Sequence, residues 1–230
     1  MKDLKQILDH ANALGHTVEV VSHIKSGKEA SVYRALLDGK MVAMKAYKDP
    51  TERSFRNNDE YLAGKFYKRS SERKAVAKKN KFGRTLKQDN WIKREFFMLQ
   101  KLYEAGASIP KPILQVEDAI FMELLGDADG VAPRLIDLEL SSREAKRAYQ
   151  SVIKSMVIFW ELGIVHGDLS AYNILWWKSK PFIIDFPQSI DARLHPAARG
   201  ILERDLKNVS TYFGRYLKID LADVESKFKK

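Results

Sequence analysis

Three polar residues in the second half of the chain have the types and spacing that phosphoryl transfer needs. Asp168 and Asn173 are five positions apart, and Asp185 follows twelve positions after Asn173. Short apolar runs of strand character, Gly-Ile-Val before the pair and Ile-Leu-Trp-Trp after it, confine the pair to a tight loop. A carboxylate can accept or orient the attacking hydroxyl, and further oxygen ligands can hold magnesium between phosphates. The three residues therefore predict a phosphoryl-transfer site.

The same stretch resembles the catalytic loop His-Arg-Asp-x-x-x-x-Asn and the following Asp-Phe-Gly of protein kinases, with two departures. Gly167 stands in place of the arginine, and Pro187 stands in place of the glycine. Because that arginine pairs with a phosphorylated activation loop in ordinary protein kinases, we do not expect activation by this route. Ser170 stands where serine/threonine kinases carry a lysine near the transferred phosphate. The negative charge on the phosphoryl group in the transition state therefore lacks the positive side chain that this lysine provides.

Size and composition narrow the class of protein. At 230 residues the chain can bury a sizeable core, as one large domain or as two small lobes. It has no cysteine, which excludes disulfides, thiolate metal sites and cysteine nucleophiles. No apolar run approaches the length that spans a bilayer, so we expect a cytoplasmic protein with no membrane partner.

The net charge of +10 is concentrated in one segment. Residues 52–88 contain twelve Lys or Arg against four Asp or Glu, which accounts for eight of the ten excess positive charges. The segment lacks clear periodicity, so we expect a long, partly mobile insertion. Basic runs with interleaved aromatic residues can bind RNA. A solvated loop that touches nucleotide or substrate transiently explains the segment equally well.

The beginning of the chain predicts a helix and a small antiparallel sheet. Residues 4–14 have the apolar spacing of a short amphipathic helix. Three strands are expected between residues 17 and 47, with a hairpin turn at 38–39. The turn between the first two strands is where a nucleotide's phosphates would lie in a kinase. It contains a single glycine, Gly27, and it does not match a Walker A loop.

Lys45 lies centrally in the third strand, in Val-Ala-Met-Lys, which matches the kinase Val-Ala-Ile-Lys pattern. That pattern places an ammonium group on the α- and β-phosphates, although a lysine alone in a strand is normally solvated. Glu95 lies in a helix expected over residues 89–104, on the same face as Trp91 and Met98, and therefore points inward. We predict an ion pair between Lys45 and Glu95.

A further strand, expected over residues 119–125, falls where the hinge of a kinase would lie. The backbone groups of Met122, Glu123, Leu124 and Leu125 would then hydrogen-bond adenine. No side chain in this stretch proves that contact.

The rest of the chain predicts two helices and a tail. The clearer helix covers residues 141–163, begins with a Ser-x-x-Glu capping box and carries a wide apolar stripe. This helix would support the catalytic loop. A second helix is expected over residues 200–217, and a short basic tail from Leu221 ends the chain.

Four motifs together closely resemble the RIO family of atypical serine/threonine protein kinases, of the RIO1-like type. They are Ser-Gly-Lys-Glu-Ala-Ser-Val-Tyr (26–33), His-Gly-Asp-Leu-Ser-Ala-Tyr-Asn-Ile-Leu (166–175), Ile-Asp-Phe-Pro-Gln (184–188) and Leu-Glu-Arg-Asp-Leu-Lys-Asn-Val (202–209). The combination is far more specific than any one motif. It implies an α+β, two-lobed protein-kinase-like fold, with a small antiparallel-sheet N-lobe that includes helix C and a mainly helical C-lobe, trimmed of the activation segment. The expected divisions are an N-terminal helix (1–16), an N-lobe with the flexible basic insertion (17–125) and a C-lobe (126–230).

The resemblance also implies roles for individual residues. Mg-ATP, with manganese as an alternative metal, would be held through Asn173 and Asp185, while Asp168 would act as the catalytic base. Lys45 would contact the phosphates with support from Glu95. The turn that would contact the nucleotide consists of Ser26, Gly27, Lys28, Glu29, Ala30, Ser31 and Val32.

The function implied is an ATP-dependent serine/threonine protein kinase that autophosphorylates on serine and is therefore a phosphoprotein. In some members ATP hydrolysis passes phosphate through the metal-binding aspartate, in which case Asp185 would itself be the acceptor. The protein substrate cannot be named from the sequence.

Two alternatives stay open. Small-molecule kinases that act on aminoglycosides, choline or sugars share the fold and the His-Gly-Asp loop. Their pockets usually need a larger helical insertion than the 40 or so residues between Gly126 and His166 provide. The other alternative is an ATP-gated switch that binds RNA or a ribosomal particle through residues 52–88 and has no protein substrate. Relatives assist maturation of the small ribosomal subunit, a role that fold resemblance transfers only weakly.

Overall fold

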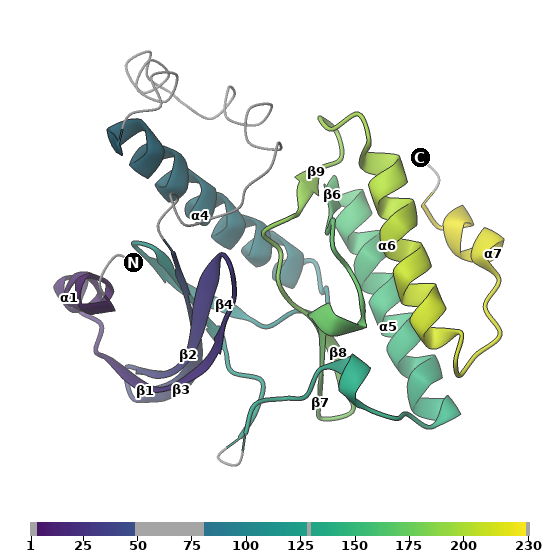
Figure 1. Ribbon diagram of the computed structural model, residues 1–230, viewed down its shortest axis with the longest axis horizontal. Helices are drawn as coiled ribbons and strands as arrows, with labels where there is room; N and C mark the ends of the chain where they lie inside the picture. Colours follow the sequence, from purple (N-terminus) through teal and green to yellow (C-terminus); the bar gives the residue numbers. More distant parts are fainter. Residues whose placement is uncertain (1–3, 49–80, 128–129, 229–230) are drawn as a thin grey trace. The chain divides into compact units, whose positions relative to one another are not determined.

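The computed structural model describes residues 4–48, 81–127 and 130–228, with only the helical backbone given for residues 81–90. The chain divides into two compact units, and Figure 1 labels most of their helices and strands. Unit 1 consists of Met1–Met98 and Lys111–Leu124, and unit 2 of Leu99–Pro110 and Leu125–Lys230. The predicted fold class, α+β with a small antiparallel sheet and a mainly helical second part, is confirmed.

A five-stranded antiparallel sheet is the frame of unit 1, in the order β1-β2-β3-β5-β4. Its strands are β1 (Val18–Ser26), β2 (Ala30–Leu37), β3 (Lys40–Tyr47), β4 (Pro112–Val116) and β5 (Ala119–Glu123). The three strands predicted near the start of the chain are therefore present. Asp38 and Gly39 join β2 to β3, and both have positive φ, as a tight two-residue hairpin requires.

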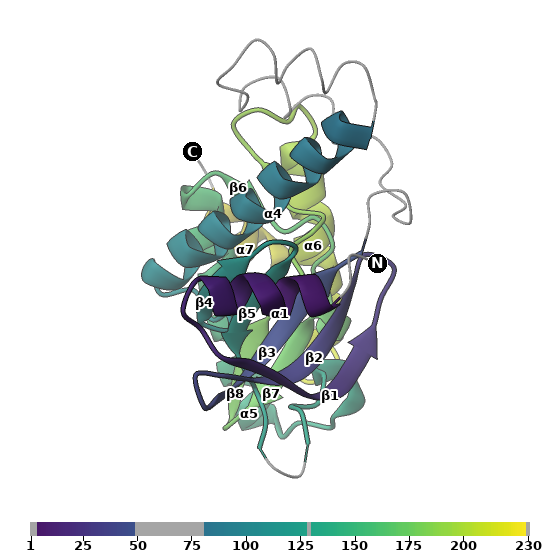
Figure 2. The same ribbon diagram turned by 90° about the vertical axis from the view of Figure 1, so that its left-hand side faces the viewer.

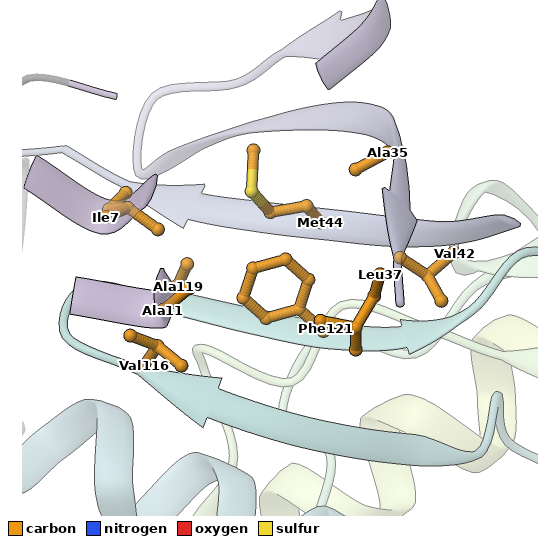
Figure 3. Close-up of a cluster of buried hydrophobic side chains, with 9 residues drawn as sticks. All are labelled: Ile7, Ala11, Ala35, Leu37, Val42, Met44, Val116, Ala119 and Phe121. Atoms are coloured by element: carbon orange, nitrogen blue, oxygen red, sulfur yellow. The ribbon is translucent and has the colours of Figure 1, made fainter. Parts of the chain in front are cut away.

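The helix α1 (Leu4–Ala13) packs against one face of this sheet, as Figure 2 shows. Ile7 and Ala11, one turn apart on the helix, are buried together with Met44 of β3 and Phe121 of β5 (Figure 3). Burying a side chain such as Phe121 contributes about 2 kcal/mol to stability. The cluster thereby fixes β3 and β5, which carry Lys45 and the residues 122–123 among the predicted nucleotide contacts.

The helix that was expected over residues 89–104 is longer at its start. It is α4 (Lys81–Glu104), so residues 81–88 of the expected basic insertion are helical. The Lys, Arg, Gln and Leu residues of this stretch are good helix formers, a preference that the positive charge of the segment conceals. Residues 52–80 of the insertion lie outside the described residues, and its predicted properties are not tested.

Unit 2 is built around two longer helices and short strands. Its elements are η2 (Leu135–Asp137), α5 (Ser142–Glu161), β6 (Ile164–Val165), η3 (Ala171–Asn173), β7 (Ile174–Trp177), β8 (Lys180–Ile183), β9 (Ile190–Asp191), α6 (Ala198–Phe213) and α7 (Leu221–Ser226). The predicted capping box opens α5: Ser141 accepts from the N–H of Glu144, and Glu144 accepts from the N–H of Ser141. No helix within the described residues has the length and apolar composition needed to cross a membrane.

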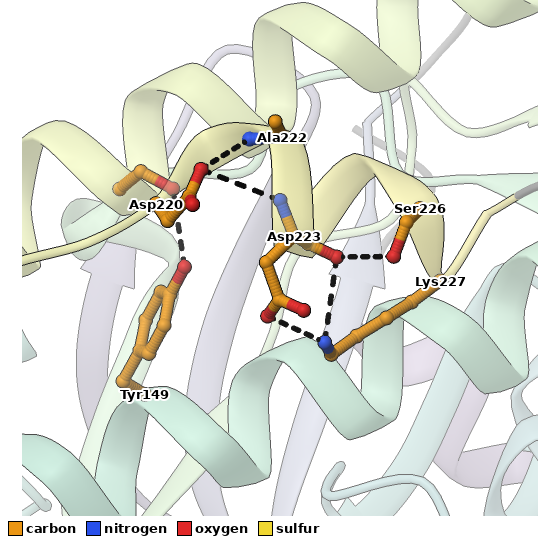
Figure 4. Close-up of polar contacts among 7 residues, drawn as sticks. Tyr149, Asp220, Ala222, Asp223, Ser226 and Lys227 are labelled. Atoms are coloured by element: carbon orange, nitrogen blue, oxygen red, sulfur yellow. Dashed lines mark hydrogen bonds and ion pairs between the residues drawn. The ribbon is translucent and has the colours of Figure 1, made fainter.

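The last described residues correct the expectation of a basic tail, because they form the helix α7. Asp220 caps this helix by accepting hydrogen bonds from two backbone N–H groups at 2.9 and 3.4 Å, and Asp223 bonds a lysine one turn later (Figure 4). Val224 and Phe228 are 4% and 0% exposed. These two apolar residues, four positions apart, are buried on one face of a segment whose overall composition is charged.

Candidate active site

A buried ion pair in unit 1 joins Lys45 of β3 to Glu95 of α4. Lys45 Nζ lies 3.2 Å from Glu95 Oε1, and the two side chains are 12% and 4% exposed. An unpaired charge at such depth is costly, so removal of either side chain would leave the other as an uncompensated buried charge. The predicted ion pair is confirmed. The contact of Lys45 with nucleotide phosphates stays a prediction.

The turn between β1 and β2 is compact and closed by bonds within the chain. The N–H of Gly27 donates to the carbonyl of Ala30 at 2.8 Å, and Lys48 Nζ donates to the carbonyl of Gly27 at 2.7 Å. The hydroxyls of Ser26 and Ser31 lie 3.0 Å apart. The seven residues predicted to contact the nucleotide therefore share one hairpin. Sequence reasoning missed Lys48, which holds the turn from the end of β3.

The stretch predicted to bind adenine is divided between the two units, with residues 122–124 in unit 1 and Leu125 in unit 2. The N–H of Glu123 donates to the carbonyl of Lys111, and the carbonyl of Leu125 accepts from the N–H of Ala132, both at 2.8 Å. Two of the backbone groups in this stretch are therefore already bonded within the chain. The contact with adenine stays a prediction.

Asp168 and Asn173 lie on the loop between β6 and β7 in unit 2, as the sequence predicts. The side-chain amide of Asn173 donates to the backbone carbonyl of Asp168 at 2.8 Å and to its carboxylate at 3.3 Å. With its nitrogen used in this way, Asn173 presents its amide oxygen as the atom that can contact a metal. Asp168 is exposed and Asn173 is half-buried, so both remain accessible to small molecules.

Asp185 follows β8 in a left-handed conformation, with φ of +70°. The preceding residue, Ile184, donates its N–H to the carbonyl of Asn173 at 3.0 Å, and its carbonyl lies 3.1 Å from Nε2 of His166. The following residue, Phe186, is buried, with its ring centroid 4.7 Å from that of His166. The structure thus holds the exposed Asp185 beside the loop in a strained conformation that costs about 1–3 kcal/mol and is typical of functional sites.

The backbone conformation and surroundings of Gly167 explain why this position does not carry the arginine of ordinary protein kinases. Its φ is +85°, and a Cβ atom at this position would overlap the backbone carbonyl of Gln188. An arginine side chain therefore cannot occupy this position without moving the segment that follows Asp185. The reason is the close approach of two backbones, which cannot be read from sequence.

Sequence reasoning missed the support that α6 gives to this loop. Asp205 is fully buried and accepts hydrogen bonds from the N–H of Gly167 at 2.8 Å and of Leu169 at 3.1 Å. Arg204 and Asn208 donate to the carbonyls of the same two loop residues. Burial raises the pKa of Asp205 to about 6, against the opposing effect of the two N–H donors. The sequence offered one indication of this support: an aspartate, Asp205, inside an amphipathic helix and within the motif at 202–209.

The oxygen donors of the loop fit a metal that arrives with a nucleotide. Within the described ranges, no group of three or more His, Cys, Asp or Glu side chains is placed to hold a metal ion. Magnesium usually takes only one or two protein carboxylates and completes its shell with phosphates and water. The amide of Asn173 and the carboxylate of Asp185 suit that requirement, and manganese accepts the same ligands.

The sheet with its buried lysine–glutamate pair, and the helical unit with its Asp-x-x-x-x-Asn loop, define a protein-kinase-like fold. A family model described as RIO domain matches residues 31–226. The chain therefore belongs to the RIO domain family, as its motifs predicted.

Curated relatives match most of the chain. Serine/threonine-protein kinase rio1 of Schizosaccharomyces pombe is 35% identical over 209 residues, which cover 87% of this chain and 39% of that protein. RIO-type serine/threonine-protein kinase Rio1 of Haloferax volcanii is 32% identical over 204 residues, which cover 87% and 65%. Serine/threonine-protein kinase RIO1 of Homo sapiens is 32% identical over 209 residues, which cover 88% and 34%. The chain thus spans between about one third and two thirds of the length of these relatives.

Proposed function

We propose that this chain is an ATP-dependent serine/threonine protein kinase of the RIO type. The observation that carries the proposal is the loop in which the amide of Asn173 is bonded to Asp168, with Asp185 held beside it. The names of the curated relatives, which match over most of this chain, support protein rather than small-molecule acceptors.

Asp168 would act as the catalytic base. Its exposed carboxylate can accept the proton of an attacking serine or threonine hydroxyl, and the bond from Asn173 orients it. The bond from the hydroxyl oxygen to the γ-phosphorus forms as the bond to the β-phosphate oxygen breaks, and ADP leaves. A positioned base contributes roughly 10²- to 10⁴-fold to such a rate.

Asn173 and Asp185 would hold the metal of Mg-ATP, with manganese as the alternative. When bound, the metal neutralises charge on the phosphate oxygens. Asn173 would contribute its amide oxygen and Asp185 its carboxylate. The left-handed backbone at Asp185 fixes where that carboxylate can be presented.

Residues earlier in the chain would bind the rest of the nucleotide. Lys45 would contact the α- and β-phosphates, oriented by Glu95. The hairpin at residues 26–32 would cover the phosphates, and residues 122–125 would hydrogen-bond adenine through backbone groups.

Several finer properties belong to the same proposal. The protein would autophosphorylate on serine and act in the cytoplasm. Hydrolysis of ATP through a phosphorylated Asp185 would be a side activity or an alternative cycle. Binding of RNA or a ribosomal particle would involve residues 52–88, most of which lie outside the described residues.

The test of the site is phosphate transfer from Mg-ATP to an added protein, with wild type and Asp168→Asn compared. We expect the variant to lose roughly 10²- to 10⁴-fold in kcat. Asp223→Asn, an exposed aspartate of α7, is the matched control and should retain full activity. Equal activity of Asp168→Asn and wild type would exclude Asp168 as the base.

A further inference from the structure

A buried tyrosine, Tyr47, lies next to the ion pair of unit 1. It is two residues after Lys45 in β3, so the two side chains share one face of the sheet. Tyr47 is 2% exposed, and Lys45 Nζ lies 5.1 Å from the centroid of its ring. A cation over an aromatic face at this distance is attracted to the ring, and the attraction is stronger where water is excluded.

The same ring also contacts the helix that carries Glu95. The rings of Tyr47 and Trp91 are 5.0 Å apart at 87°, an edge-to-face arrangement with a preferred geometry. Trp91 precedes Glu95 by one helical turn, so both side chains lie on one face of α4. The backbone of Tyr47 is fixed as well, because its N–H donates to the carbonyl of Asp118 at 2.8 Å. Tyr47 therefore links the strand of Lys45 to the helix of Glu95.

The hydroxyl of Tyr47 stays protonated next to a carboxylate, Glu95, that has one unbonded oxygen. Burial raises the pKa of Tyr47 well above its ordinary value, and the negative charge of Glu95 raises it further while Lys45 opposes both. The hydroxyl consequently keeps its proton and can donate it in a hydrogen bond. Glu95 accepts from Lys45 through Oε1, whereas its Oε2 is buried with no hydrogen-bond partner within the described residues. A buried carboxylate oxygen gains from a neighbouring O–H donor.

We propose that Tyr47 is a positioning residue of the nucleotide site, acting on both members of the Lys45–Glu95 pair. Its ring attracts the ammonium group of Lys45. Its hydroxyl is the O–H donor that we assign to Oε2 of Glu95, an atom that has no bond from any described residue in this conformation. The pair is thereby held in one geometry before ATP arrives, which lowers the ordering cost of binding phosphates. The proposal rests on the proposed role of Lys45 as the phosphate contact.

Tyr47→Phe tests the hydroxyl while it preserves the ring and its contact with Trp91. We expect KM for ATP to rise roughly tenfold, as loss of one hydrogen bond to a charged group implies, with kcat nearly unchanged and Tm lowered as by any lost buried hydrogen bond. Tyr212→Phe is the matched control, since it removes a buried tyrosine hydroxyl that donates to the carbonyl of Leu135 at 2.7 Å in unit 2. That control should lower Tm and leave KM unchanged. The same pattern in Tyr47→Phe would reduce Tyr47 to a packing residue and overturn the proposal.

A double-mutant cycle shows whether Tyr47 acts through Glu95, with the affinity for a fluorescent ATP analogue as the readout. In the Glu95→Gln background, Tyr47→Phe should weaken binding far less than it does in the wild type. Independent, additive effects would contradict the proposal. Lys45→Ala separates the two levels. If Lys45→Ala retains turnover, the proposed function is refuted. If Lys45→Ala loses turnover but Tyr47→Phe has an unchanged KM for ATP, only the role of Tyr47 is refuted.

Discussion

The backbone N–H of Gly167 donates a hydrogen bond to the buried carboxylate of Asp205, 2.8 Å away, across 38 positions of sequence. A second N–H, that of Leu169, bonds the other carboxylate oxygen. One side chain of α6 thus holds the loop on both sides of Asp168. The position of Asp168, the proposed base, therefore depends on Asp205, a residue outside the loop.

Replacing Asp205 with asparagine should therefore impair both stability and activity. An amide has one accepting oxygen, so one of the two loop N–H groups would face an NH₂ group and lose its partner. We expect a loss of about 1–3 kcal/mol in the free energy of unfolding, measured by urea denaturation, and a lower kcat. Asp223→Asn, in the exposed part of α7, should change neither quantity appreciably. Normal activity of Asp205→Asn would show that the loop keeps its geometry without this carboxylate.

Asp205 should also make stability depend on pH. Its pKa is about 6 in the folded protein against an ordinary 3.8. Since the folded state binds this proton more tightly, the stabilising contribution is complete below pH 3.8 and is lost as pH rises through 6. A shift of about two units corresponds to at most about 3 kcal/mol. The difference in unfolding free energy, wild type minus Asp205→Asn, should fall as pH rises from about 4 to about 7. A constant difference would contradict the raised pKa.

Gly167→Ala tests the close approach of the two backbone segments. The variant would have to adopt a positive φ and also displace the carbonyl of Gln188. Gly106→Ala provides the matched control, because Gly106 has φ of +84° and open space around its missing Cβ. We expect the control to lose about 1–2 kcal/mol from backbone strain alone and Gly167→Ala to lose roughly 2 kcal/mol more, with reduced turnover. Equal losses would mean that the segment at Gln188 moves aside without cost.

The burial of α7 predicts that the end of the described chain stabilises unit 2. Phe228 is 0% exposed, and its carbonyl accepts a hydrogen bond from Arg199 of α6 at 3.0 Å. Phe228→Ala should lower the free energy of unfolding by about 3–5 kcal/mol, measured by thermal or urea denaturation. Leu221→Ala, at a leucine of α7 that is 43% exposed, should cost much less. Similar small losses for both variants would show that the segment from α7 to Phe228 is not part of the stable fold.

Local patterns in the sequence predicted the parts of the site that lie close together in the chain. The loop from Asp168 to Asn173 and the capping box of α5 each depend on residues within a few positions of one another. Lys45 and Glu95 are 50 positions apart, yet a motif on the strand and an inward-facing acid on the helix predicted their ion pair. The fold class, confirmed for the described residues, followed from the four motifs that resemble the RIO family.

Contacts between distant segments were not predictable in the same way. Nothing near Gly167 in the sequence indicates that Asp205 will bond its N–H or that Gln188 will exclude a side chain. The early start of α4 and the burial of Phe228 were hidden because charged residues dominate both segments. A high content of charged residues indicates that a segment is exposed to water. The buried face of a short helix depends on only two or three apolar positions, which such a composition hides.

The most direct test of the central claim is the chemical identity of the transferred phosphate. Purified protein would be incubated with magnesium and γ-labelled ATP, with and without an added protein substrate, and labelled chains would be treated with acid and with hydroxylamine. Acid-stable label on serine or threonine, transferred also to the added protein and lost in Asp168→Asn, is the predicted result. Label that hydroxylamine removes, with steady release of phosphate and none on the added protein, would instead identify an acyl-phosphate at Asp185 and contradict a protein kinase.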